Sequence, residues 1–323
     1  MAAGFYYLCP HMSQHTILGA GGVIGRELAQ VLPAYADTVR LVSRHPKKVN
    51  AGDELVPADL TDKASVSKAV TGSSVVYLTA GLPYRINIWR EQWPVIMDNV
   101  ISACLEHDSA LIFFDNIYAY GKVDGPITET CPLKPSSEKG KVRVRLAETL
   151  EAAWEKKGLK GAIVRAADFY GKGADHSMFD VLVLQKFKQG KKAQWICNDN
   201  VRYSMTYTLD AALGTAMIGH TPESWQQVWH LPSSTEALTA GDLISLSAKL
   251  ATVSAGRTLL KKPMLKIAGI FDKTVRELVE MTYQYQYDYI FDSSKFEAYF
   301  NIHATAYQDG LQQTLGASGA PEA

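Results

Sequence analysis

The sequence contains little cysteine, and the few cysteines are far apart. Its four cysteines are Cys9, Cys104, Cys131 and Cys197, and no two of them form a CxxC pair. This spacing argues against a disulfide framework and against a cysteine zinc site, and it favours a reducing compartment, so we expect a cytoplasmic protein. The eight histidines are scattered along the chain, and we expect no bound metal.

The sequence also lacks net charge and any long apolar run. Lysine plus arginine number 33, as do aspartate plus glutamate, so neither nucleic acid nor a membrane is an expected partner. No apolar stretch is long enough to span a bilayer. The N-terminal MAAGFYYLCPH has no basic region and no sustained apolar core, which argues against a signal peptide. We therefore treat residues 1–14 as an N-terminal extension and Met12 as a candidate for the natural start.

What the sequence does contain is a glycine-rich turn between a short apolar run and a helical pattern. The stretch TILGAGGVIG at residues 16–25 is followed by RELAQVL, which predicts strand, turn and helix. Glycine allows backbone to approach a pyrophosphate closely, and the N–H groups that begin a helix face the anion. The spacing GxGxxG fails because its third glycine falls on Ile24, whereas GxxGxxG fits Gly19, Gly22 and Gly25. A glycine turn with no ligand is the alternative.

With this spacing the chain resembles the extended and atypical short-chain dehydrogenase/reductases, a group that contains NAD(P)-dependent epimerases and dehydratases. The resemblance runs from Thr16 to about Phe300. It implies that the turn and the first helical residues bind a dinucleotide, namely Gly19, Gly22, Val23, Ile24 and Gly25. It also implies that two later strand ends meet the adenine, ribose and phosphates, through Asp59, Leu60, Thr79, Ala80 and Gly81.

The end of the second expected strand, TVRLVS at residues 38–43, bears on the choice of dinucleotide. An acid here would accept from the 2′-hydroxyl of NAD, whereas an arginine would pair with the 2′-phosphate of NADP. The sequence offers Ser43 and Arg44 and no acid, so we expect NADP, with NAD less favoured. Alternatively, Arg44 belongs to a solvated loop.

Strand and helix patterns alternate along the first half of the chain and predict an α/β fold. We expect a Rossmann-type, doubly wound parallel sheet of about seven strands. The family resemblance implies a small C-terminal substrate-binding lobe beside it. The expected NAD(P)-binding domain covers residues 15–172. A mixed segment at 173–315 holds the lobe and returning Rossmann elements, and 316–323 form a disordered tail. The family resemblance also suggests a homodimer.

The catalytic pair that the resemblance implies, YxxxK on a helix, is missing. Anchored on Ala147 and Glu148, the tyrosine position falls on Gly140 and the lysine position on Val144. A small shift in register gives Lys139 and Arg143 instead, either of which could supply the positive charge of the lysine.

A formal YxxxK at Tyr118 and Lys122 is interrupted by Gly121, and we treat it as a chance match. Tyr118 nevertheless follows the fifth expected strand and could supply a phenol from another backbone position. Asn116, just before it, is a candidate for orienting a substrate, or simply a turn residue.

The sixth expected strand ends in a turn that resembles the family's RxxNxYGPG, with Arg165, Tyr170 and Gly171 retained. Asp168 replaces the asparagine, and Asp168 and Tyr170 are candidate acid or base groups at the carboxyl edge of the sheet. Asp168 could instead pair with Arg165 and take no part in chemistry.

These observations predict an NADP-dependent oxidoreductase or epimerase/dehydratase-like enzyme that acts on a carbonyl or hydroxyl of a small molecule. Its catalytic candidates are Asn116, Tyr118, Arg143, Asp168 and Tyr170. Two alternatives remain open. The protein could sense NADP or a metabolite without turnover, or it could be a lyase or isomerase that holds NADP structurally.

Overall fold

The computed structural model describes residues 13–316 and contains a seven-stranded sheet in which every strand pair is parallel. The strand order is β10-β6-β5-β4-β1-β2-β3. The strands are β1 (Gln14–Leu18), β2 (Thr38–Ser43), β3 (Glu54–Pro57), β4 (Val75–Leu78), β5 (Ala110–Asn116), β6 (Gly161–Ala166) and β10 (Val228–His230). The order reverses beside β1, which gives the doubly wound arrangement, and the expected fold class is confirmed.

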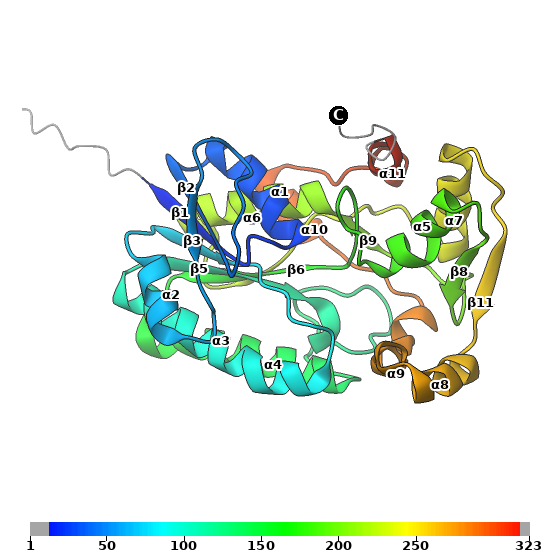
Figure 1. Cartoon of the computed structure of the whole chain (residues 1–323), viewed down its shortest axis with the longest axis horizontal. Helices are drawn as coiled ribbons and strands as arrows, with labels where there is room; N and C mark the ends of the chain where they lie inside the picture. Colours follow the sequence, from blue (N-terminus) through cyan, green and yellow to red (C-terminus); the bar gives the residue numbers. More distant parts are fainter. Residues whose placement is uncertain (1–12, 317–323) are drawn as a thin grey trace, which may run out of the picture.

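Helices cover both faces of this sheet (Figure 1). One face carries α1 (Val23–Val31), α6 (Thr208–His220) and α10 (Ser294–Phe300), and the other carries α2 (Lys63–Val70), α3 (Ile86–Glu106) and α4 (Glu138–Lys157). Short 3-10 helices interrupt the connections at η1 (Leu32–Ala34), η2 (Ile117–Ala119) and η4 (Pro222–Ser224). The two helical layers bury every residue of β4 and β6. The β4 sequence VVYL is apolar throughout, as a strand covered on both faces requires, whereas β6 also contains Arg165.

The first strand begins at Gln14, so the fold starts inside the segment that we had treated as an extension. Asp62 caps α2, because its carboxylate accepts from the N–H groups of Ala64 and Ser65. Residues 1–12 and 317–323, with the candidate start Met12 and most of the expected tail, lie outside the described residues.

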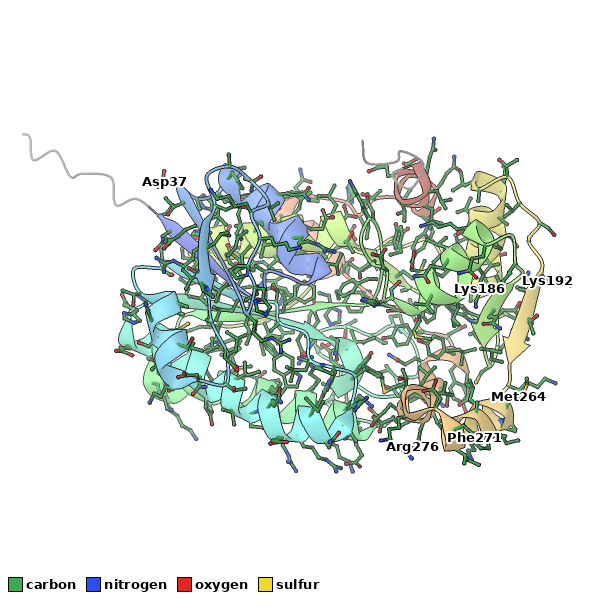
Figure 2. The ribbon with its side chains drawn as sticks, viewed as in Figure 1. Asp37, Lys186, Lys192, Met264, Phe271 and Arg276 are labelled. Atoms are coloured by element: carbon green, nitrogen blue, oxygen red, sulfur yellow. The ribbon has the colours of Figure 1, made fainter. Side chains whose placement is uncertain are left out.

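The remaining elements form a lobe at one end of the molecule (Figure 1). Two small parallel sheets pair β8 (Ala193–Ile196) with β11 (Arg257–Leu260), and β7 (Asp168–Tyr170) with β9 (Met205–Tyr207). The helices are the π-helix η3 (Asp180–Leu184), α5 (Gln185–Lys188), α7 (Ala240–Leu250), α8 (Lys262–Phe271), α9 (Lys273–Val279) and α11 (Tyr307–Gly316). Side chains of α8, among them Met264 and Phe271, lie at the outer end of this lobe (Figure 2).

Aromatic residues alternate along the sequence after α9, at Tyr283, Tyr285, Tyr287, Tyr289 and Phe291, but they do not form a continuous strand. A 3-10 helix, η5 (Thr282–Tyr285), begins this segment, and the Thr282 hydroxyl donates to the carbonyl of Val279 at 2.8 Å. Only isolated bridges follow, at Tyr289 and Phe291, while Tyr287 is exposed. Packing of η5 and the residues after it against the lobe therefore outweighs the strand preference of the alternating aromatic residues.

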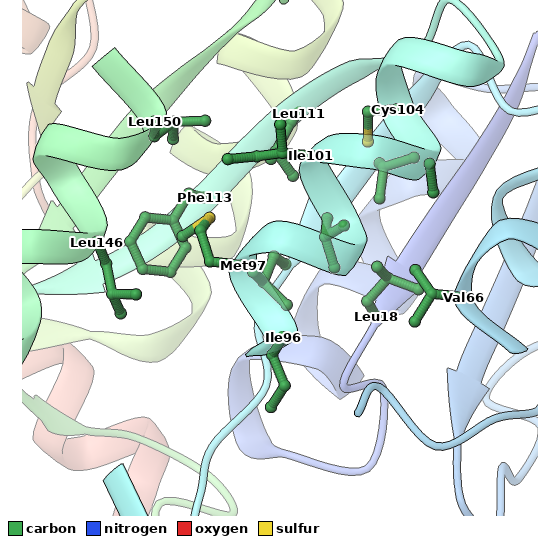
Figure 3. Packing of buried hydrophobic residues seen from close by; sticks show 14 of the residues in the cluster. Leu18, Val66, Ile96, Met97, Ile101, Cys104, Leu111, Phe113, Leu146 and Leu150 are labelled. Atoms are coloured by element: carbon green, nitrogen blue, oxygen red, sulfur yellow. The ribbon is translucent and has the colours of Figure 1, made fainter. Parts of the chain in front are cut away.

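One packed region lies between the sheet and α2, α3 and α4 (Figure 3). Met97 and Ile101 of α3 pack with Leu111 and Phe113 of β5, and Leu146 of α4 completes the layer. A second cluster lies under α1 and α6, and a third fills the lobe. Among the described residues, no helix is long and apolar enough to cross a membrane.

Burial of His15 makes stability depend on pH. Burial lowers the pKa of His15 to about 4, and its ring lies 3.0 Å from the Tyr77 hydroxyl. Because the unfolded histidine binds a proton more readily, this residue stabilises the fold near neutral pH and ceases to do so as pH falls below about 6.5. Between pH 7 and 5 the wild type should lose roughly 2 kcal/mol more free energy of unfolding than His15→Gln. Urea titrations at the two pH values measure this difference.

The matched control for this prediction is His45→Gln, which changes an exposed histidine. The control should retain the pH dependence of the wild type. A His15→Gln variant with the same pH dependence as the wild type would contradict the assignment.

Candidate active site

The glycine turn lies at the carboxyl edge of the sheet, between the ends of β2 and β4. The N–H groups of Gly19 and Ala20 donate to the carbonyl of Val42 at 2.9 and 3.1 Å. Gly19 has a φ of +100°, and a Cβ there would collide with the backbone of Ala80. Gly19 is therefore required for a turn that lies directly against the end of β4.

The start of α1 is open to an acceptor from outside the helix. Gly22 is the N-cap and offers no side-chain acceptor to the first N–H groups, which belong to Val23, Ile24 and Gly25. A Cβ on Gly21 would meet no atom within 4 Å, so the turn is open on this side. Free N–H groups at a helix N-terminus and an open glycine backbone fit the pyrophosphate of a dinucleotide.

The ends of β2 and β3 meet beside this turn. The carbonyl of Ser43 accepts from the N–H of Ala58 at 3.0 Å, and Arg44 and Asp59 follow as exposed residues. The Asp59 carboxylate accepts from the backbone and hydroxyl of Thr61, which lower its pKa, and the nearby charge of Arg44 acts in the same direction. Arg44 therefore lies close to Asp59 in an exposed position.

Leu60 and the end of β4 complete this part of the edge. The carbonyl of Leu60 accepts from the Asn99 amide of α3 at 3.1 Å, which fixes the loop after β3. The N–H of Thr79 donates to the carbonyl of Leu18 at 2.9 Å, and Ala80 and Gly81 continue beside the glycine turn. The residues expected to bind the cofactor thus lie together along one edge.

Tyr118 occupies the region where the sequence lacks its expected helical tyrosine. Asn116 caps η2, and its amide oxygen accepts from the N–H of Tyr118 at 3.0 Å, which is the turn role weighed from the sequence. A Cβ on Gly140 of α4 would lie only 2.5 Å from the carbonyl oxygen of Tyr118. Backbone therefore excludes a tyrosine at 140, while the side chain of Tyr118 comes from η2, just after β5.

The Tyr118 phenol is half-buried among aromatic and charged groups. Its ring stacks on Trp89 of α3, with centroids 6.3 Å apart. Burial raises the pKa of Tyr118 to about 12, opposed first by a hydrogen bond with Tyr84 and then by the charge of Arg143. Tyr118 is therefore protonated at neutral pH and able to donate a hydrogen bond.

Lys139 does not provide the free charge that the sequence suggested. Its ammonium is fully buried and forms ion pairs with Glu277 and Glu280, which belong to α9 and the turn after it. The backbone N–H groups of Ile86 and Glu138 donate to the same two carboxylates. Lys139 thus joins the lobe to α4 and is not available to a cofactor ribose.

Arg143 lies in a buried ionic cluster beneath Tyr118. Its guanidinium lies 3.4 Å from Asp115, and its central carbon lies 4.3 Å from the ring centre of Trp93. Arg165 donates through Nε to the same carboxylate at 3.1 Å and through Nη1 to the Tyr120 hydroxyl at 2.8 Å. Arg143 can thus stabilise negative charge near Tyr118, although it cannot exchange a proton at ordinary pH.

Asp168 does not form the pair with Arg165 that was weighed from the sequence, because Arg165 is paired with Asp115. The Oδ2 of Asp168 accepts from the Tyr203 hydroxyl at 3.0 Å, and its Oδ1 accepts from the N–H of Phe169 at 3.1 Å. Burial raises the pKa of Asp168 to about 6, against the effect of these hydrogen bonds. Its charge raises the pKa of Tyr118, which indicates that the two groups are close. A carboxyl with this pKa can act as acid or base near neutral pH.

Tyr170 is separate from these groups. Its side chain is 1% exposed and packs against Tyr207 and Tyr307, with ring centroids 5.3 and 5.7 Å away. It also contacts Gly310 of α11. The structure places Tyr170 in the aromatic core, and we leave it out of the proposed site.

Sequence reasoning missed the aromatic residues that surround Asp168 and Tyr118. Tyr203 binds Asp168 directly, Tyr285 stacks on Tyr203 with centroids 5.5 Å apart, and Tyr84 bonds to Tyr118. The only signal for Tyr203 was the alternating segment RYSMTYTL, which predicts a strand and gives no indication of a site.

The sheet order and the open glycine turn define a Rossmann-type dinucleotide-binding protein. A model of the NAD dependent epimerase/dehydratase family matches residues 15–229. The chain belongs to this family.

The chain is also similar to a plant protein and to several solved structures. It is 25% identical over 300 residues to 3beta-hydroxysteroid-dehydrogenase/decarboxylase isoform 2 of Arabidopsis thaliana, covering 83% of this chain and 52% of that protein. The chain therefore spans about half the length of this curated relative.

Three solved structures share the fold. UDP-glucuronic acid 4-epimerase from Bacillus cereus, in complex with NAD, has a TM-score of 0.77 at 18% identity, with 94% of this chain and 98% of that chain covered. The NAD complex of Thermus thermophilus UDP-glucose 4-epimerase has the same score and identity, covering 95% and 100%. A dTDP-glucose 4,6-dehydratase from Streptomyces venezuelae with NAD bound scores 0.76 at 16% identity, covering 94% and 96%.

Proposed function

We propose that this protein is an NADP-dependent enzyme that interconverts a hydroxyl and a carbonyl group on a small molecule, as an oxidoreductase, epimerase or dehydratase. The observation that carries the proposal is the proximity of Tyr118 and Asp168 after β5 and β6, whose carboxyl ends share an edge with the glycine turn. A phenol and a carboxyl at this edge are suited to proton exchange beside a redox cofactor.

The proposed mechanism divides the proton work between two side chains. The nicotinamide, when bound, supplies or accepts a hydride at C4. Asp168, held by Tyr203, takes the proton of a substrate hydroxyl as carboxylate and returns it in the reverse direction. Tyr118 donates a hydrogen bond to the substrate oxygen, in a position fixed by the Asn116 cap. Arg143 favours negative charge on that oxygen.

The proposed preference for NADP rests on Arg44. It is exposed at the end of β2, where a 2′-phosphate would lie, and the nearby Asp59 is already engaged by Thr61. Replacing Arg44 with alanine should weaken NADPH binding by about tenfold or more and leave NADH binding nearly unchanged. Fluorescence titration of the two reduced cofactors measures the ratio of their affinities.

Lys47→Ala is the matched control, because Lys47 is an exposed cation in the same loop. It should leave the ratio of NADPH to NADH affinity within about twofold of the wild type, since a solvated charge that does not contact the phosphate contributes little. If Arg44→Ala left the ratio unchanged, the proposed phosphate contact would be wrong.

A cofactor-sensing protein without turnover is the second candidate. It is favoured by the close packing at Gly140, which leaves no room for a helical tyrosine. The helical phenol is excluded there by the backbone of Tyr118, and Lys139 is committed to Glu277 and Glu280. Formation of reduced nicotinamide from NADP⁺ and a secondary alcohol supports the enzyme. Tight NADP binding without any such reduction supports the sensor.

We also propose that the protein forms a homodimer through α3 and α4. A groove between these helices is lined by apolar residues such as Pro94 and by charged residues of both signs, among them Asp98, Arg145 and Glu148. Packing of two such helix pairs would cover this mixed surface.

A further inference from the structure

The outer face of α8 is apolar and exposed. Among the described residues, the four most exposed large apolar side chains all belong to this helix. They are Met264, Ile267, Ile270 and Phe271, with exposed fractions of 52%, 63%, 73% and 87%. Clustered exposure of this kind marks an interaction surface more often than an isolated exposed residue does.

The fold holds α8 so that this face points outward. Leu265 and Gly269 form the buried side, and a Cβ on Gly269 would lie 2.9 Å from the Cα of Arg276 in α9. Asp272 caps α9 and joins the two helices. Figure 2 shows Met264, Phe271 and Arg276 together at the outer end of the lobe. The apolar face is therefore a fixed feature of a closely packed helix pair.

The charge around this face is strongly basic although the whole chain is neutral. Residues 257–276 contain six basic residues and one acidic residue, and the acid, Asp272, serves as the cap of α9. Arg257 is paired with Asp199, which leaves five basic residues in this segment without that partner. Lys261, Lys266, Lys273 and Arg276 are exposed. The overall composition does not reveal this local excess of basic residues, because acidic residues elsewhere in the sequence balance it.

We infer that α8 docks on the surface of an anionic phospholipid bilayer. An interfacial helix inserts large apolar side chains at the boundary of the acyl chains while lysines at its edge contact anionic headgroups. Met264, Ile267 and Phe271 are the large apolar side chains that would insert, and Lys261 and Lys266 are the lysines that would contact the headgroups. The lipid surface is preferred over a protein partner because apolar and basic groups are combined on one short helix. This inference does not depend on the redox proposal.

The test measures flotation of the full chain with vesicles of phosphatidylcholine alone or containing about one third phosphatidylglycerol. The wild type should float with the anionic vesicles and bind neutral vesicles about tenfold more weakly. Ile267→Ser/Phe271→Ser and Lys261→Gln/Lys266→Gln should each reduce binding to anionic vesicles by about tenfold or more. All four residues are exposed, so the variants should retain the wild-type circular dichroism spectrum.

Matched controls replace similar residues elsewhere on the surface. Val181→Ser/Val253→Ser removes exposed apolar side chains, and Lys156→Gln/Lys157→Gln removes basic residues at the end of α4. Both should bind vesicles as the wild type does. The inference fails if the wild type does not float, or if the α8 variants float as well as the controls. Sedimentation without lipid tests whether a second copy of the chain covers this face instead. If the wild type forms an oligomer that Ile267→Ser/Phe271→Ser dissociates, and does not bind vesicles, the face is a subunit interface.

Discussion

Replacing Asp168 with asparagine is expected to reduce the rate of alcohol oxidation with NADP⁺ by about 100-fold or more while leaving NADP affinity unchanged. An amide can still accept the hydrogen bond of Tyr203, but it cannot take the proton of the substrate. Because burial raises the pKa of Asp168 to about 6, the wild-type rate should rise with pH through about 6 and then level off. The variant should lack this pH-dependent limb. Stopped-flow measurement of reduced nicotinamide over a pH series tests both effects.

The same substitution should stabilise the fold. A carboxyl whose folded-state pKa is raised binds its proton more tightly when folded, so its contribution to stability falls as pH rises from about 4 to 6. The substituted amide would not ionise, and the Asp168→Asn variant should gain roughly 2–3 kcal/mol in free energy of unfolding at pH 8. The matched control for the loss of activity is Asp210→Asn, another partly buried acid, which accepts hydrogen bonds from Thr305 instead. A fully active Asp168→Asn variant, with the wild-type pH profile, would contradict the proposed role.

Replacing Asp115 with asparagine should cost about 3–5 kcal/mol of stability, because two buried guanidinium groups would lose their carboxylate. Arg165 and Arg143 are 1% and 6% exposed, and both are paired with Asp115. Nε and Nη1 of Arg143 and Nη2 of Arg165 are buried without a hydrogen-bond partner, so the nearby carboxylate is the main compensation for the two positive charges. Guanidinium titrations of the wild type and the variant give the loss directly.

Two further variants separate this cluster from an ordinary surface ion pair. Asp108→Asn removes the exposed partner of Lys160 and should change stability by less than about 1 kcal/mol. Adding Arg143→Met to Asp115→Asn should recover part of the lost free energy of unfolding. The apolar methionine can pack against Trp89 and Trp93 and leaves no buried charge unpaired at this position. A loss below about 1 kcal/mol for Asp115→Asn itself would contradict the importance of the cluster.

The cofactor edge could be predicted from sequence because it follows from local patterns and topology. Gly19 precedes a helix whose N-cap has no side-chain acceptor, and parallel strands bring their carboxyl ends to one edge. Arg44, Asp59 and Thr79 therefore needed only correct strand assignments to be placed near the turn. The roles of these residues in binding remain predictions.

The catalytic region could not be predicted in the same way, because it depends on contacts between distant segments. Lys139 is paired with Glu277 and Glu280, which lie 138 and 141 residues further along the chain. The exclusion at Gly140 comes from the carbonyl of Tyr118, and no motif records that backbone contact. Tyr203 reaches Asp168 only because β9 pairs with β7 and positions the preceding segment. Spacing within the sequence contains none of this information.

The most direct test of the proposed function is a crystal structure of the protein with NADP bound. We expect the carboxyl of Asp168 or the hydroxyl of Tyr118 to lie within hydrogen-bond reach of the space beside nicotinamide C4. We also expect Arg44 to lie against the 2′-phosphate. A nicotinamide whose C4 faces only apolar side chains, or a space closed to any substrate, would contradict an oxidoreductase and favour a cofactor-sensing protein.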